Sequence, residues 1–275
     1  MNEKHRAKKS LGQHFLRSKT ALREIIAASN IKNEETILEI GPGEGALTRA
    51  LLDAGAHVIA VETDQRCILL LHEKFAHELT QKALQLIEGD IRDSATQELL
   101  YKKEYLGSKP YKIVANIPYY ITGMLFKLFL EILRQPTHIV FLVQKEVAEQ
   151  IIARDGKESI FSLAVKVYGT PRYVAKVKRE AFAPPPKVDS AVIAIEHISR
   201  EQLKDIKEEK YFRIIKAGLG AKRKMLMGNL LRTLPLEKTT LSKIFHQLDI
   251  PEHVRGEDVP VEKWIALAKA IATQI

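Results

Sequence analysis

The sequence of 275 residues contains a single cysteine, Cys67. One thiol excludes a disulfide framework and a zinc site built from cysteines, and we expect no metal site. No apolar run approaches the roughly 20 residues that a membrane-spanning helix requires. The N-terminal stretch is basic but lacks the apolar core of a secretory signal. The composition therefore favours a cytoplasmic globular protein with no membrane partner, long enough for one large and one small domain.

Acidic residues are scarce in three separate segments, although the chain as a whole carries 34 of them against 43 basic residues. Residues 1–23 contain seven Lys and Arg and one acid, Glu3. Residues 166–179 contain five basic residues and residues 210–236 contain seven, both without an acid. One such run is commonly a solvated face, but three of them favour a surface for a polyanion such as a nucleic acid.

Short apolar runs alternate with amphipathic segments through the first two thirds of the chain, which is typical of a parallel α/β sheet. Two later segments, 172–178 and 188–196, alternate with period two around three prolines and are expected to form an antiparallel hairpin that closes a seven-stranded, mostly parallel sheet. We expect the other strands at 36–40, 57–62, 84–88, 111–115 and 137–143, and helices at 46–53, 65–77, 121–133 and 159–168.

The composition changes near residue 199, after which only helical patterns appear. We expect a domain at 1–198, with a basic N-terminal segment at 1–18, and a small all-helical domain at 199–275. Prolines separate its expected helices, which lie at 211–219, 225–234, 241–248 and 261–273.

A glycine-rich turn with the sequence EIGPGEG, residues 39–45, follows the first expected strand and opens a helix. Glycines at this place let a ligand approach the backbone where the free amides of a helix N-terminus point. The turn holds two acids and lacks a Lys-Ser/Thr ending, which argues against a phosphate site of the P-loop kind. The ligand is therefore expected to be a nucleoside without phosphates.

Two acids follow the next strands of the expected sheet. Glu62 ends the second strand, where its carboxylate can accept hydrogen bonds from both ribose hydroxyls. Asp90 follows the third strand and can accept from an adenine amine. Each acid alone is also consistent with a solvated strand end or a helix cap. Together with the glycine turn they converge on the crevice beyond the carboxyl ends of the strands, where open α/β sheets bind ligands.

The sequence NIPY, residues 116–119, ends the fourth expected strand. The side-chain oxygen of Asn116 and the carbonyl of Ile117, fixed by Pro118, can each accept one amine hydrogen, and Tyr119 can stack on a ring. A flipped adenine fits this set of groups. The alternative is an ordinary exit from strand to loop, and the nearby cofactor signals favour the first interpretation.

With these motifs in order, the chain resembles the S-adenosylmethionine-dependent rRNA adenine dimethyltransferases, specifically the KsgA-type group that modifies small-subunit rRNA. The resemblance covers nearly the whole chain and implies a Rossmann-like class I methyltransferase fold. It is carried by KSLGQHFL at 9–16, EIGPGEG at 39–45, NIPY at 116–119, FAPPPKVDS at 182–190 and RKMLMGNL at 223–230.

The resemblance implies a role for each site residue. Tyr119 and Phe182 would bracket the target base. Position 14 is often Asn in this family, so whether His14 acts through its side chain or its backbone stays open. Contacts to S-adenosylmethionine are implied for His14, Leu16, Gly41, Glu62, Asp90 and Asn116, and we expect RNA contacts from Lys187, Lys222, Arg223 and Lys224.

The expected reaction is methyl transfer to the exocyclic amines of two adjacent adenosines near the 3′ end of 16S rRNA in the 30S subunit, catalysed by a monomer. Groups that position the amine and face its developing positive charge suffice for this reaction, and we assign no general base. One alternative is a resistance-type dimethylase acting on 23S rRNA, and another is a ribosome-assembly or transcription factor that keeps the fold without the chemistry. A dehydrogenase ranks last, because nothing in the glycine turn selects a dinucleotide.

Overall fold

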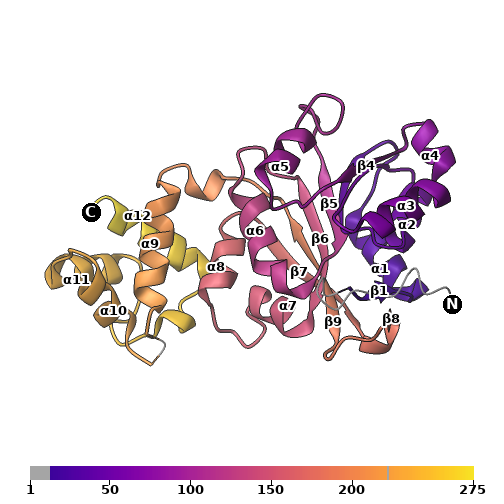
Figure 1. Cartoon of the computed structure of the whole chain (residues 1–275). Helices are drawn as coiled ribbons and strands as arrows, with labels where there is room; N and C mark the ends of the chain where they lie inside the picture. Colours follow the sequence, from indigo (N-terminus) through magenta and orange to yellow (C-terminus); the bar gives the residue numbers. More distant parts are fainter. Residues whose placement is uncertain (1–12, 222) are drawn as a thin grey trace. The chain divides into compact units, whose positions relative to one another are not determined.

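A computed structural model describes residues 13–221 and 223–275, and it divides into two compact units (Figure 1). The first unit comprises residues 1–148 and 172–196 and contains a seven-stranded sheet of order β4-β3-β2-β5-β6-β9-β7. The strands are β2 (Thr36–Ile40), β3 (His57–Glu62), β4 (Leu84–Glu88), β5 (Lys112–Asn116), β6 (His138–Gln144), β7 (Thr170–Val177) and β9 (Ser190–Glu196).

The strand pairing confirms a mostly parallel sheet. β2 pairs in parallel with β3 and β5, and the parallel pairing continues outward from β3 to β4 and from β5 to β6. β9 runs antiparallel to β6, from Ile139 opposite Ile195 to Gln144 opposite Ser190. All of β2 and most of β5 and β6 are buried. This explains their continuous apolar sequences, because a parallel sheet is covered on both faces.

The helices α2 and α6 lie where the periodicity predicts them. The helix predicted at 65–77 is wrong as a single element: it breaks at Phe75, whose fully buried ring joins the core. The helices α1 and α5 were not predicted. The helices are α1 (Lys19–Ser29), α2 (Ala46–Asp53), α3 (Gln65–Lys74), α4 (Ala76–Thr80), α5 (Ser94–Leu100), the 3₁₀ turn η3 (Tyr119–Ile121) and α6 (Thr122–Glu131), and α7 (Lys145–Ile152) crosses the unit boundary.

A second, two-stranded sheet was also not predicted. It pairs β1 (Phe15–Leu16) antiparallel with β8 (Phe182–Ala183), so that Leu16 lies opposite Phe182. The 3₁₀ turn η4 (Arg179–Ala181) precedes β8, and the Arg17 amide donates to the Ala181 carbonyl at 2.7 Å. This small sheet fixes the chain around residue 15 to the segment between β7 and β9.

The second unit comprises residues 149–171 and 197–275 and is helical. Its second segment begins two residues before the predicted boundary at 199, and the unit also takes in α8 from earlier in the chain. Trp264 is fully buried at its centre, with its Nε1 donating to the Gly256 carbonyl at 2.9 Å. The helices are α8 (Ile160–Lys166), η5 (Glu201–Leu203), α9 (Glu208–Leu219), α10 (Leu226–Thr233), α11 (Lys238–Gln247), η6 (Gly256–Asp258) and α12 (Val261–Ala272).

Within 13–221 and 223–275, no helix has the length and apolar character that a membrane span requires. The same residues contain no group of three or more His, Cys, Asp or Glu side chains arranged to hold a metal ion.

Candidate active site

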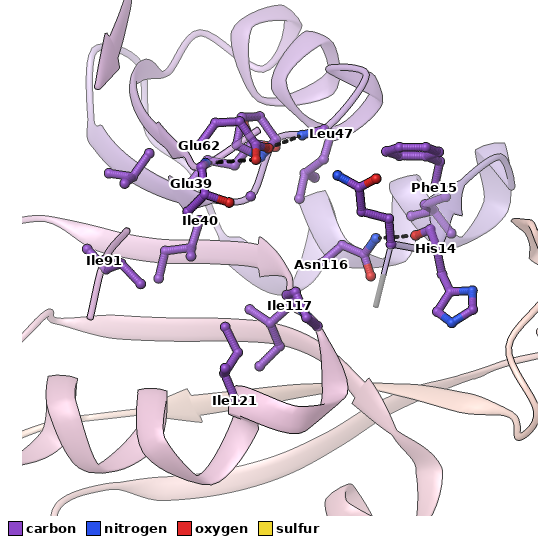
Figure 2. Close-up of a pocket in the computed structure, with 18 of the residues that line it drawn as sticks. His14, Phe15, Glu39, Ile40, Leu47, Glu62, Ile91, Asn116, Ile117 and Ile121 are labelled. Atoms are coloured by element: carbon purple, nitrogen blue, oxygen red, sulfur yellow. Dashed lines mark hydrogen bonds between the residues drawn. The ribbon is translucent and has the colours of Figure 1, made fainter. Parts of the chain in front are cut away.

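A cavity in the first unit lies at the carboxyl ends of β2, β3, β4 and β5 (Figure 2). It brings together almost every residue that the sequence predicts for the cofactor and the target base. The lining residues from that prediction are His14, Leu16, Gly41, Glu62, Asp90, Asn116, Ile117, Pro118 and Tyr119. Because these residues come from five separate parts of the chain, the convergence results from the fold.

The glycine turn between β2 and α2 provides the floor of this cavity. Gly41, Gly43 and Gly45 all have positive φ, at 68°, 55° and 79°. A Cβ on Gly43 or Gly45 would collide with aromatic rings, at 2.9 Å from Phe15 and 2.5 Å from Phe75. A Cβ on Gly41 would meet nothing within 4 Å. The open space at Gly41 therefore suits a ligand that lies directly on the backbone, as a nucleoside cofactor requires.

Glu62 ends β3 and holds the glycine turn in place. Its Oε2 accepts from the Gly43 amide at 3.0 Å, and its Oε1 accepts from the amides of Thr63 and Asp64 at 2.8 and 2.9 Å. Burial raises the pKa of Glu62, and these backbone donors oppose that rise. The carboxylate thus has a structural role that the sequence did not predict, which is to hold the backbone of the turn. It also lines the cavity.

Glu39 is a lining residue that the sequence analysis noted only as an acid beside the turn. It lies one residue before the end of β2 with 1% of its surface exposed, and its Oε2 accepts from the Thr48 hydroxyl at 2.7 Å. Burial raises the pKa of Glu39 to about 8, and the nearby Glu62 charge adds to the rise. At neutral pH this side chain holds its proton, so the cavity floor carries less negative charge than the two acids suggest.

Asp90 lies on the cavity wall with both carboxylate oxygens bound to Arg92. Oδ1 accepts from the Arg92 amide and Nε, both at 2.9 Å, and Oδ2 accepts from Nη2 at 2.5 Å. These bonds hold the pKa of Asp90 below its usual value. An adenine amine must therefore share Asp90 with Arg92, a neighbour two residues away that the sequence analysis did not include.

Asn116 ends β5, and its side-chain amide is oriented by the backbone of His14. Its Nδ2 donates to the His14 carbonyl at 3.0 Å, and Figure 2 shows this bond. The nitrogen is thereby engaged, and the side-chain oxygen remains as the acceptor at the strand end. Pro118 follows in extended geometry, with φ −59° and ψ 133°, before the chain turns into η3.

Tyr119 is held at its hydroxyl, which forms a 2.7 Å hydrogen bond with the Ser190 hydroxyl at the start of β9. Burial raises the pKa of the Tyr119 phenol, which therefore stays protonated. The next residue, Tyr120, also lines the cavity and is 60% exposed. Tyr120 was not predicted as a site residue, although it is a second aromatic directly after NIPY.

Phe182 is the one predicted pocket residue that the structure does not bring to the cavity wall. Its ring is 4% exposed and belongs to the apolar core, because the pairing of β8 with β1 places it beside Leu16. Leu16 is buried in the same cluster and does line the cavity. A direct contact of Phe182 with the target base stays a prediction, and the observed position gives it a packing role.

The residues predicted for RNA lie in both units. Lys187 is exposed in the loop between β8 and β9 of the first unit, and Arg223 and Lys224 are exposed between α9 and α10 of the second. Lys222 lies outside the described residues. Exposed cations of this kind are suited to phosphate contacts.

Comparisons with known proteins identify the family. The model of the family described as ribosomal RNA adenine dimethylase matches residues 4–273. A Dehalococcoides mccartyi protein named ribosomal RNA small subunit methyltransferase A is 39% identical over 259 residues, covering 94% of this chain and 86% of the relative. A Fusobacterium nucleatum protein of the same name is 38% identical over 274 residues, covering 98% of both chains.

Solved structures show the same fold. A dimethyladenosine transferase from Plasmodium falciparum has 25% sequence identity and a TM-score of 0.74, covering 92% of this chain and 96% of its own. The 23S rRNA methyltransferase ErmE has 24% identity and a TM-score of 0.72, with coverage of 93% and 98%. The match to the family model extends over nearly the full length, and the identity to the relatives is well above what fold alone produces. The chain belongs to the ribosomal RNA adenine dimethylase family.

Proposed function

We propose that this protein transfers methyl groups from S-adenosylmethionine to the exocyclic amines of two adjacent adenosines near the 3′ end of 16S rRNA, within the 30S subunit or its precursor in the cytoplasm. The observation that carries the proposal is the orientation of Asn116. Its nitrogen is bound to the His14 carbonyl at 3.0 Å, so its oxygen is the group available to an incoming amine.

The cofactor fits the cavity by the chemistry of its lining. Gly41 offers open space beside the backbone, Glu62 offers a carboxylate for ribose hydroxyls, and Asp90 offers one for the adenine amine. Leu16 supplies an apolar wall, and His14 contributes through its carbonyl, which holds Asn116. When bound, S-adenosylmethionine supplies an electrophilic methyl group.

The residues of this chain act on the amine of the target base. The adenine amine is a poor nucleophile because its lone pair is delocalised into the ring. Hydrogen bonds from the amine to the Asn116 side-chain oxygen and to the Ile117 carbonyl favour a pyramidal nitrogen whose lone pair is free to attack. Both acceptors are dipoles that face the positive charge developing on that nitrogen.

No group in the cavity has to remove a proton before the attack. The amine proton becomes acidic only after the nitrogen has acquired its positive charge, and it can then leave to water. Tyr119 is an unsuitable base because burial raises the pKa of its hydroxyl, which also bonds Ser190. Catalysis therefore rests on the positions of Asn116 and Ile117 relative to the base.

The small subunit is favoured as the substrate by the names of the relatives, which are about 38% identical over nearly the whole chain. The likeness to ErmE, at 24% identity, supports the fold alone. Phosphate contacts would come from Lys187 and from the basic stretch at 222–224. We also propose that the enzyme acts as a monomer.

The test is methyl transfer to undermethylated 30S and 50S particles, with the product nucleoside identified by mass spectrometry. We expect dimethyladenosine in 30S alone. Product in 50S would favour the 23S alternative, and no product in either particle would favour a non-catalytic assembly factor.

Asn116→Ala is the matched variant: turnover should fall at least tenfold with RNA affinity nearly unchanged, because the basic surfaces hold the particle. A parallel collapse of RNA affinity would contradict the positioning role.

A further inference from the structure

Gly228 is an exposed glycine within a helix of the second unit, α10. Its φ is not positive, and a Cβ built on it would meet no atom of the described residues within 4 Å. Gly218 in α9 differs, because a Cβ there would lie 2.5 Å from the Trp264 ring. Glycine destabilises a helix relative to alanine. The fold therefore carries a cost at Gly228 for which neither packing nor backbone geometry gives a reason.

Gly228 shares the outer face of α10 with Met225 and Arg232. Successive members of this set are three and four residues apart, so they lie on one side of the helix. All three are exposed, Met225 at 55%. We call these three residues the α10 face. Between an apolar side chain and a cation, this face offers bare helix backbone, which lets the backbone of another molecule approach closely.

The buried side of α10 holds this face in place. The Asn229 side chain is 1% exposed, and its Nδ2 donates to the carbonyls of Gly218 and Ala221 at 2.8 and 3.1 Å. The Leu226 amide donates to the Val254 carbonyl at 2.9 Å. A surface that is already fixed loses little conformational freedom when a partner docks on it, which favours binding.

The surroundings of the α10 face are positively charged. Residues 210–236 contain seven basic residues and no acid, and α9 packs against α10 (Figure 1). Among the described residues, the exposed cations of this stretch that have no acidic partner are Arg213, Lys216, Arg223, Lys224 and Arg232. Unpaired cations around a bare helix face are complementary to a sugar–phosphate backbone.

We propose that the sugar–phosphate backbone of the substrate RNA lies directly against the α10 face, with Gly228 at the closest approach and Arg232 bound to a phosphate. The inference rests on the proposed function for the identity of that RNA. It extends the contacts predicted at 222–224 along the helix that follows them. A side chain at position 228 would hold the RNA away from the helix and lengthen the phosphate contacts of the neighbouring cations.

The first test measures 30S affinity and thermal melts of Gly228→Ala and Gly228→Leu. Gly228→Ala should raise the melting temperature by about 1–4 °C, because the helix loses its glycine. It should nevertheless weaken 30S binding by about threefold, and Gly228→Leu by about tenfold or more, because phosphate contacts lengthen.

Thr239→Ala is the matched control, since Thr239 is exposed on α11 and alanine improves its helix propensity as well. It should bind 30S like wild type. More stable Gly228 variants with wild-type 30S affinity overturn the proposal.

The second test is the salt dependence of 30S binding. Arg232→Gln should lower the slope of the logarithm of the binding constant against the logarithm of salt concentration by about 0.7–0.9, the contribution of one phosphate. Lys243→Gln is the control, because Lys243 is an exposed cation on α11, and its slope should match wild type. Equal slopes for the two variants overturn the proposal, because the charge of the whole unit would then determine binding.

A tethered probe identifies what lies on the α10 face. Met225→Cys introduces a reactive thiol, whereas Cys67 is buried and burial raises its pKa to about 12. With iron–EDTA attached at position 225, the 30S complex should show cleavage of the 16S rRNA backbone. Intact rRNA, together with weak 30S binding by Gly228→Leu, would assign the face to a ribosomal protein and overturn the proposal. Failure of the proposed function would appear differently, as wild-type enzyme that transfers no methyl group to 30S while the rRNA cleavage persists.

Discussion

The substitution of Glu62 separates structural from cofactor roles at the glycine turn. Three backbone amides donate to its carboxylate, from Gly43 at 3.0 Å, Thr63 at 2.8 Å and Asp64 at 2.9 Å. Glu62→Gln keeps an oxygen for two of these donors but turns an amide nitrogen toward Gly43. One buried N–H then lacks an acceptor. Glu62→Ala removes the acceptor for all three.

The magnitudes follow from these contacts. One unsatisfied buried donor costs about 1–3 kcal/mol, and each kcal/mol lowers the melting temperature of a chain of this size by about 2–4 °C. Burial raises the pKa of Glu62, so its charge is itself costly in the folded protein, and Glu62→Gln recovers part of the loss. We expect the loss of charged hydrogen bonds to the ribose to weaken the binding of S-adenosylmethionine by a further ~1.5–3 kcal/mol. This equals about a 10- to 150-fold loss of affinity.

Calorimetry with S-adenosylmethionine and thermal melts without it measure the two effects separately. Glu88→Gln is the control, because Glu88 lies opposite Glu62 in the β3–β4 register and is exposed. We expect the control to match wild type in both assays. Wild-type cofactor affinity in folded Glu62→Gln would remove Glu62 from the cofactor site, leaving only its role in holding Gly43.

Three further predictions concern charge and packing. The buried Glu39 has a pKa of about 8, against an ordinary 4.5, so the folded protein retains a proton that the unfolded chain releases between these pH values. The free energy of unfolding should therefore fall as pH rises from about 4.5 to 8. Thermal melts of Glu39→Gln over the same pH range should lack this part of the fall. Gly41→Ala should lower cofactor affinity in calorimetry and reduce the melting temperature only modestly, because its Cβ meets no protein atom within 4 Å. Gly45→Ala should fail to fold, because its Cβ would lie 2.5 Å from the Phe75 ring. Equal melting temperatures for the two variants would contradict this. Replacing the three basic residues at 222–224 with Gln should lower the slope of the logarithm of the 30S binding constant against the logarithm of salt concentration by about two. Cofactor affinity should not change. An unchanged slope would favour RNA contacts from the N-terminal basic segment instead.

Elements with strong local patterns could be predicted closely from the sequence. The bounds of β2, β3, β4 and α2 are as predicted, because each apolar run is bounded by turn or charged residues. The periodicity did not reveal the break at Phe75, since an apolar residue there fits a continuous helix. The Phe75 ring packs in the apolar core, a tertiary contact that no local pattern encodes, and α3 ends at Lys74, directly before it.

The strands β1 and β8 have two residues each, which is too short for a periodic pattern to be recognised in the sequence. Their pairing nevertheless determines which side chains reach the cavity. Their pairing buries Phe182, which the family resemblance placed at the base, and fixes the chain next to His14.

The contacts that shape the candidate base site join residues far apart in the sequence. Asn116 and His14 are separated by 102 positions, His14 and Pro184 by 170, and Tyr119 and Ser190 by 71. Residue types and spacing predicted Asn116 as the acceptor and Tyr119 as the ring, and both side chains line the cavity. They could not predict how the Asn116 amide is turned, because a carbonyl from the other end of the domain sets its orientation. Through the carbonyl of His14, the start of the described chain therefore fixes the orientation of the Asn116 amide in the cavity.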